Sequence, residues 1–196
     1  MKNEVIIGID LAAKPENSTG WALWKNKIVK TALIHTDSEI IEKIVENNPT
    51  IVAIDAPFSL PKKGMLRNAD KEMIRLGYRV FPPKLPSMKQ LTLRCIRLNK
   101  LIRGKGYETI EVHPTSTCKA LSMPIKKWEE IQDILKKMGL KGDVRTRVLS
   151  PHEIDAVISA LTAHLYLIGQ TESVGNDKEG YITVPKKQDW RTFKVI

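Results

Sequence analysis

Three aspartates stand where an acid is unexpected, and together they could hold a divalent metal ion. Asp10 ends the apolar run at residues 5–9, and Asp55 ends a second apolar run at residues 51–54. Asp155 lies near the start of a mostly apolar stretch at residues 151–168. Taken singly, an Asp after a strand is more often a turn former. Grouped carboxylates repel one another unless one is protonated or a cation lies between them, so the three together indicate a hard ion such as Mg²⁺.

The order of the predicted elements would bring the first two acids together. Residues 4–9, 20–24 and 28–34 are predicted as three strands of an antiparallel meander. A helix that starts at Ser38 then leads to a fourth strand at residues 50–54. Because a helical crossover connects them, the first and fourth strands can be parallel neighbours. Asp10 and Asp55 would then lie about 5 Å apart at the carboxyl edge of the sheet, where open α/β sheets bind their ligands.

The rest of the chain completes one α/β domain. A fifth strand at residues 108–113 and helices around residues 128–137 and 151–167 follow. We therefore expect a mixed five-stranded sheet, with an antiparallel meander followed by two parallel strands, flanked by helices. A chain of 196 residues suits a single domain over residues 1–196, in which residues 57–105 form a basic, Pro-containing insertion after the fourth strand.

The last predicted helix supplies the third acid. Ser150, Pro151 and Glu153 form a capping box with Pro at the first helical position, which gives Glu153 a structural role. The helix is otherwise apolar nearly all round and must be buried. Asp155 shares a narrow polar stripe with His152, so it is either a metal ligand or an acid stabilised by the helix dipole.

A fourth ligand is open to two interpretations. Glu111 lies near the end of the fifth strand and alternates with Ile110 and Val112. It either completes the carboxylate cluster or belongs to the wet face of an edge strand. His113 and His152 are possible proton carriers near neutral pH, although a lone histidine is more often structural.

The charge distribution favours an anionic partner. The formal net charge is +10, with a pI near 9.6, and residues 62–105 contain thirteen Lys or Arg against two acids. The predicted helix at residues 87–103 has its apolar residues on one face. On the opposite face we expect nucleic-acid contacts from Lys89, Arg97, Lys100 and Arg103, with Arg67 as a further contact. Two other interpretations are open. The cations of the helix could form only the solvated face of a lysine-rich thermostable protein. Arg67 could pair with Asp70 at i,i+3 spacing.

Few features of the sequence point to a particular cellular compartment. Cys95 and Cys118 show no metal-binding spacing and are expected to be buried free thiols. The apolar run at the amino terminus is too short for the core of a signal peptide, and the most apolar stretch is interrupted by polar residues. We therefore expect a cytoplasmic protein that does not span a membrane.

Several motifs, in order, resemble a known family. GIDLA, IDAPFSLP, RNAD at residues 67–70, EVHP, the last helix with its Asp-Ala pair, and EGYITVP resemble the predicted-nuclease family called domain of unknown function 429, within the ribonuclease H-like superfamily. The resemblance implies two Mg²⁺ or Mn²⁺ ions held by carboxylates, a role that falls on Asp10, Asp55 and Asp155, with Glu111 as the fourth candidate.

The leading hypothesis is therefore a metal-dependent nuclease that acts on nucleic acid by a two-metal carboxylate mechanism. One alternative is a nucleotide phosphohydrolase related to the actin-like ATPases, although the chain has no P-loop. Another is a nucleic-acid-binding protein that keeps the fold without catalysis. The sequence does not choose between DNA and RNA or define the oligomeric state.

Overall fold

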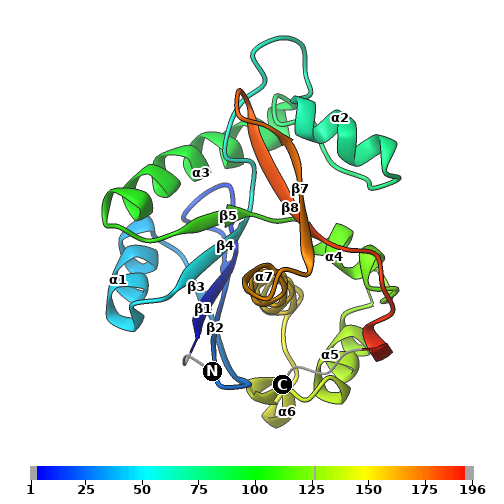
Figure 1. The fold of residues 1–196 in the computed structure, drawn as a ribbon. Coiled ribbons are helices and arrows are strands. Elements are labelled where there is room, and N and C mark those ends of the chain that lie inside the picture. Colours follow the sequence, from blue (N-terminus) through cyan, green and yellow to red (C-terminus); the bar gives the residue numbers. More distant parts are fainter. Residues whose placement is uncertain (1–3, 126, 193–196) are drawn as a thin grey trace.

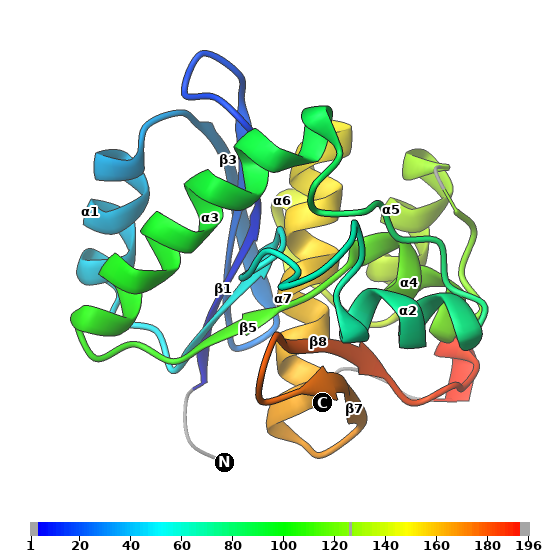
Figure 2. The same ribbon diagram turned by 90° about the horizontal axis from the view of Figure 1, so that it is seen from above.

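The computed structural model describes residues 4–125 and 127–192. A six-stranded sheet lies between two layers of helices, as Figures 1 and 2 show. The strands run in the order β5-β4-β1-β2-β3-β6. Their bounds are β1 Val5–Asp10, β2 Thr19–Lys25, β3 Ile28–Ile34, β4 Ile51–Asp55, β5 Thr109–Glu111 and β6 Lys141–Gly142.

The first three strands pair antiparallel, and the remaining pairs of this sheet are parallel. The helix α1, Asp37–Asn47, makes the crossover that allows β4 to lie parallel beside β1. The antiparallel meander, the parallel fourth and fifth strands and the flanking helices confirm the predicted fold. The sixth strand was not predicted, because its two residues carry no periodic pattern.

Each face of the sheet buries its own apolar cluster. One cluster contains the strand residues Ile7, Ile9 and Ile54 with residues of α1 and of α3, Pro86–Gly104. The other contains Ile6, Trp24 and Ala53 with side chains of the helices on the opposite face. These helices are α4 Pro114–Ala120, α5 Trp128–Lys137, α6 Asp143–Thr146 and α7 Pro151–Leu167.

The segment predicted as a basic insertion contains α3 and a shorter helix, α2, Asn68–Arg75. Cys95, Leu98 and Ile102 of α3 are fully buried against the sheet, so this helix is also the crossover from β4 to β5. The helix α2 packs instead on a separate two-stranded hairpin, β7 Thr171–Asn176 and β8 Gly180–Pro185, which the sequence did not predict. A 3₁₀ turn, Trp190–Thr192, follows the hairpin.

Both cysteines are free and buried, as predicted. Burial raises the pKa of Cys95 well above its ordinary value and that of Cys118 to about 12, so neither thiol ionises near neutral pH. Among the residues of the two described ranges, no helix has the length and apolar character needed to cross a membrane.

Candidate metal site

Two of the predicted acids lie side by side. Asp10 and Asp55 are the last residues of β1 and β4, and the parallel register places them directly opposite each other. The carboxylate of Asp10 accepts a hydrogen bond of 2.6 Å from Nδ1 of His152 at the start of α7. This bond raises the pKa of His152. The predicted meeting of two strand-end carboxylates is confirmed.

Asp55 is in a strongly negative environment. Burial raises its pKa well above the ordinary value, and the charges of Asp10, Asp155 and Glu111 raise it further, in that order. The charges of the other two predicted ligands and of Glu111 therefore all act on Asp55, but Asp155 lines a separate small cavity with Thr115 and Cys118. Within the described ranges, however, no three Asp, Glu, His or Cys side chains are arranged as a ready metal-binding group.

Two glycines allow α7 to approach the sheet closely enough to bring its polar end to these acids. A Cβ on Gly8 would lie 2.1 Å from the carbonyl oxygen of Ala156, and one on Gly20 would lie 2.0 Å from that of His152. Both contacts are with backbone atoms of α7, which cannot move aside as a flexible side chain could. The glycines in β1 and β2 therefore fix the height of α7 above Asp10 and Asp55.

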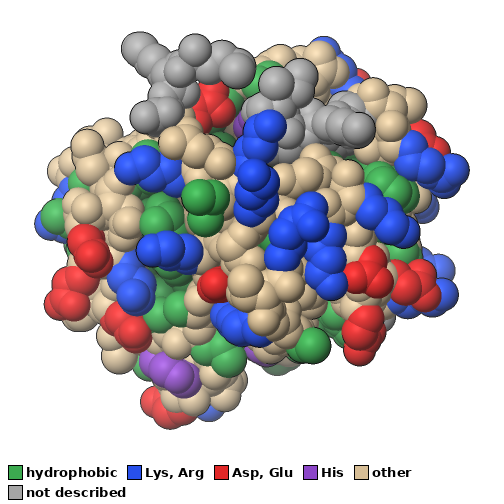
Figure 3. Space-filling model, turned by 90° about the horizontal axis from the view of Figure 1, so that it is seen from below, with side chains coloured by type: hydrophobic (Ala, Val, Ile, Leu, Met, Phe, Trp, Pro, Cys, Tyr) green, Lys and Arg blue, Asp and Glu red, His purple; other side chains and the backbone are tan. Residues whose placement is uncertain are grey.

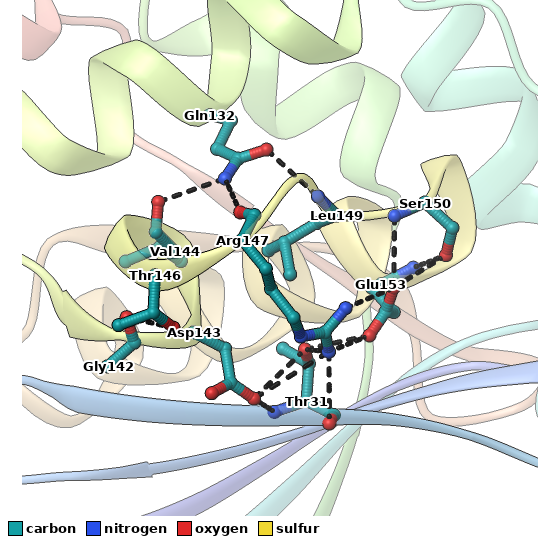
Figure 4. Close-up of polar contacts among 10 residues, drawn as sticks. All are labelled: Thr31, Gln132, Gly142, Asp143, Val144, Thr146, Arg147, Leu149, Ser150 and Glu153. Atoms are coloured by element: carbon teal, nitrogen blue, oxygen red, sulfur yellow. Dashed lines mark hydrogen bonds and ion pairs between the residues drawn. The ribbon is translucent and has the colours of Figure 1, made fainter.

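A polar network holds the amino terminus of α7 in place (Figure 4). The carboxylate of Glu153 accepts hydrogen bonds from both terminal nitrogens of Arg147, from the Thr31 hydroxyl at 2.8 Å and from the Ser150 backbone at 3.0 Å. Although burial would raise it, these bonds lower the pKa of Glu153 to about 2. The predicted capping box between Ser150 and Glu153 is present, so Glu153 is structural.

The connection that leads into α7 is anchored from α5. The side chain of Gln132 donates to the carbonyl oxygens of Val144 and Arg147 at 2.9 and 2.7 Å. Its own oxygen accepts from the Leu149 backbone at 3.1 Å, as Figure 4 also shows. Gln132 is buried, and its three bonds replace those that water would make. The start of α7 is thus fixed to both β3 and α5.

Glu111 has partners that the sequence did not indicate. Its two oxygens accept hydrogen bonds of 2.8 and 2.6 Å from Arg67, and one of them also accepts from the Phe58 backbone at 2.7 Å. Arg67 pairs on its other side with Asp70 at 2.8 Å. The alternative of a wet edge-strand face is wrong for Glu111, because its side chain is buried. The pair of Arg67 with Asp70 is confirmed.

The structure does not place Arg67 on a nucleic-acid-binding surface. Its side chain is 1% exposed and its guanidinium is held between two carboxylates. The sequence could not show this, because Arg67 and Glu111 are far apart in the chain and buried arginines are rare. Arg67 reaches the interior because its charge offsets that of Glu111, even though burial works against the charged form.

The unpredicted hairpin holds the segment that carries Arg67. The carboxylate of Glu179, in the turn between β7 and β8, accepts hydrogen bonds from the backbones of Lys62 and Asn68 at 2.7 and 2.8 Å. Its carbonyl oxygen accepts a bond from the Ser59 hydroxyl. These contacts give a structural role to the first residue of the motif EGYITVP.

The other predicted nucleic-acid contacts lie on the surface. Lys89, Arg97, Lys100 and Arg103 are exposed on α3, while Cys95, Leu98 and Ile102 are buried as predicted. Arg103 also donates to the hydroxyl of Thr109 at 2.6 Å, which ties it to β5. Lys and Arg side chains appear on the underside of the molecule as well, but there Asp and Glu side chains lie among them (Figure 3).

A cavity of about 250 Å³ opens at the carboxyl edge of the sheet. Asp10, Asp55, Arg67 and Glu111 line it, together with Met88 and Leu91 from the start of α3. His113 lies in the same wall, and its Nδ1 accepts the backbone N–H of Ser116 at 3.3 Å. Burial lowers the pKa of His113 to about 4, so it is neutral at pH 7. Carboxylates and a neutral imidazole therefore line the same cavity.

Comparison with known proteins places the chain in a family. A family described as a protein of unknown function (DUF429) matches residues 8–180, a range that includes Asp10, Asp55, Glu111 and Asp155. The chain belongs to this family. The resemblance of its motifs is thereby confirmed. No curated protein matches the sequence.

The fold of this DUF429 member is similar to that of a nuclease. The structure aligns with RuvC of Thermus thermophilus in complex with a Holliday junction substrate, with a TM-score of 0.53 and 14% sequence identity. The alignment covers 84% of this chain and 96% of the RuvC chain. A second structure of the same RuvC aligns over the same shares with 18% identity and a TM-score of 0.47. The fold is thus ribonuclease H-like.

Proposed function

We propose that this protein is a metal-dependent nuclease that hydrolyses phosphodiester bonds, with Asp10, Asp55 and Asp155 as the ligands of Mg²⁺ or Mn²⁺. The observation that carries the proposal is the in-register pair of Asp10 and Asp55 at the carboxyl edge of the sheet. The similarity to RuvC, whose structure contains a Holliday junction, supports a nucleic-acid substrate. The two-ion mechanism is part of the same proposal.

The residues at this edge fit a hard cation. Their donors are carboxylate oxygens, which Mg²⁺ and Mn²⁺ prefer. Burial and three neighbouring negative charges make ionised Asp55 unfavourable without a counter-charge, and a divalent ion supplies one. Since no three such side chains are arranged as a ready binding group within the described ranges, coordination by all three acids requires side-chain movement.

Each side chain has a distinct task in this proposal. A bound ion would stabilise the charge that develops on the reacting phosphate. His152 orients Asp10 through its 2.6 Å hydrogen bond. Both oxygens of Glu111 accept hydrogen bonds from Arg67, so Glu111 would have a positioning role and would not be a metal ligand. Arg67 would compensate the charge of Glu111 through these two hydrogen bonds.

The nucleic acid would approach across α3. Met88 and Leu91 line the carboxylate cavity, so the exposed cations of this helix continue outward from the proposed catalytic edge. Lys89, Arg97 and Lys100 would pair with backbone phosphates, and each such contact steepens the loss of affinity with salt.

A location in the cytoplasm, where nucleic acid is available, stays a prediction of the sequence.

The test is a cleavage assay with end-labelled single strand, duplex, RNA/DNA hybrid and four-way junction, in Mg²⁺ or Mn²⁺. We expect hydrolysis of at least one polymer, and Asp10→Asn should abolish it. The matched control is Asp133→Asn, because Asp133 is an exposed acid on α5 that pairs with Lys136 on the surface. Absence of cleavage of every polymer in either ion, with thermal stabilisation by nucleotides, would instead support the phosphohydrolase alternative.

A further inference from the structure

A second cavity adjoins the carboxylate cavity, and its chemistry differs. It has a volume of about 490 Å³, within the range of small-molecule sites. Phe81, His113 and Thr115 line both cavities, so they form the wall between them. Arg79 and Lys119 line the second cavity, whose described lining contains no acid. We call it the basic cavity.

The cations of the basic cavity can receive an anion. Lys119 donates one hydrogen bond of 2.7 Å to the carbonyl oxygen of Gly77, which fixes its ammonium and leaves two N–H groups for a ligand. Arg79 is exposed and presents a guanidinium, the group best suited to phosphate. The carboxylate cavity and the basic cavity therefore carry opposite charges and lie on the two sides of one shared wall.

The shared wall carries an exposed aromatic ring and an imidazole. The side chain of Phe81 is 66% exposed, although a phenyl ring in water is unfavourable. An exposed aromatic beside cationic residues is the arrangement on which unpaired bases stack. His113 belongs to the same wall, and its Nδ1 lies 2.7 Å from the Ser116 hydroxyl and accepts the Ser116 N–H at 3.3 Å.

We propose that the basic cavity holds the nucleotide next to the phosphodiester bond that lies at Asp10 and Asp55, with its phosphate at Arg79 and Lys119 and its base against Phe81. This inference rests on the proposed function and narrows it. A base in stacked duplex cannot reach Phe81 in this way, so the substrate must offer a single-stranded or unpaired nucleotide at the cleavage position.

The test measures binding without catalysis. Fluorescent single-stranded oligonucleotides, with and without a 5′-phosphate, and matched duplex are titrated into the protein in EDTA, with 5′-mononucleotides as competitors. We expect Phe81→Ala to weaken single-strand binding at least about fivefold, which is the loss of affinity expected when one base loses its aromatic stacking partner. Arg79→Gln should reduce the preference for the 5′-phosphate.

Two control variants separate the cavity from general surface effects. Arg75→Gln removes an exposed cation of the same basic segment that lines neither cavity, and Val148→Ala removes a side chain that is 81% exposed elsewhere. Both should bind like the wild type. Competition by mononucleotides would show that the cavity also takes a free nucleotide.

The outcomes distinguish this inference from the nuclease proposal. Loss of binding in Phe81→Ala and Arg79→Gln supports the nucleotide site even if no polymer is cleaved. Wild-type affinity in both variants, equal affinity of the wild type for single strand and duplex, or no binding of any probe by the wild type overturns the inference, even if cleavage is found.

Discussion

Asp10 and Asp55 lie directly opposite each other at the carboxyl ends of the parallel strands β1 and β4. Pairing in this register leaves two acids one strand spacing apart, and the side chain of Asp55 is also affected by the charge of Asp155. Such an arrangement reduces stability unless a cation or a proton compensates the charge. If the two acids bind a metal ion as proposed, function and stability make opposite demands on these positions.

The first prediction concerns stability without metal. In EDTA, Asp55→Asn should raise the melting temperature, because it removes a charge that burial and three acids disfavour. The rise should be about 2–4 °C for each kcal/mol of repulsion removed. Thermal unfolding followed by circular dichroism checks it, with Asp133→Asn as the surface control. A lower melting temperature for Asp55→Asn would show that the ionised carboxylate stabilises the fold.

The second prediction concerns the close contact between α7 and the sheet. Gly8→Ala should lower the free energy of unfolding by about 1–3 kcal/mol, because the new Cβ meets backbone atoms of α7. The matched control is Gly104→Ala, since a Cβ there meets nothing within 4 Å and should stabilise by about 0.4–1 kcal/mol. Urea denaturation measures both, and equal effects of the two substitutions would refute the packing argument.

The position of the carboxylate pair could be predicted from the sequence for a physical reason. Apolar runs that end in Asp10 and Asp55, with a helical crossover between them, permit only a few topologies, and the right-handed parallel connection is one of them. The start of α7 could also be predicted from the sequence, because Ser150, Pro151 and Glu153 specify a capped helix locally. Local rules were sufficient for these elements.

The rest of the site depends on contacts that no local rule encodes. The pair of Arg67 and Glu111 joins residues 44 apart in sequence, and a charged residue in a basic segment is normally taken as exposed. The hairpin of β7 and β8 is mostly polar in its first strand, where only Val174 is buried, so its pattern resembles a loop. Its partner α2 supplies the missing apolar contacts.

The third prediction concerns the buried ion pairs. Arg67→Leu should destabilise the protein by about 3–5 kcal/mol, because it leaves Glu111 and Asp70 as uncompensated buried carboxylates. Arg97→Leu replaces an exposed arginine of α3 and should change stability by no more than about 0.5 kcal/mol. Chemical denaturation at pH 7 compares them. A small effect of Arg67→Leu would mean that water reaches the pair.

The fourth prediction concerns pH. The pKa of Glu153 falls from its ordinary value of 4.5 to about 2 in the folded protein, so its stabilising effect is complete above pH 5 and is lost as the pH falls toward 2. Glu153→Gln should cost about 1–3 kcal/mol at pH 7, and the difference from the wild type should shrink over this range. Urea denaturation at several pH values between 7 and 2.5 tests it. A difference that stays constant with pH would contradict the assigned role.

The most direct test of the central claim is a calorimetric titration of Mn²⁺ into the wild type, Asp10→Asn, Asp155→Asn and the surface control Asp133→Asn. The carboxylate site predicts binding to the wild type and the control, and at least about tenfold weaker binding in the other two variants. No binding to the wild type, with or without nucleic acid, or equal binding to all four proteins would contradict it. The three acids would then be structural residues of a ribonuclease H-like fold.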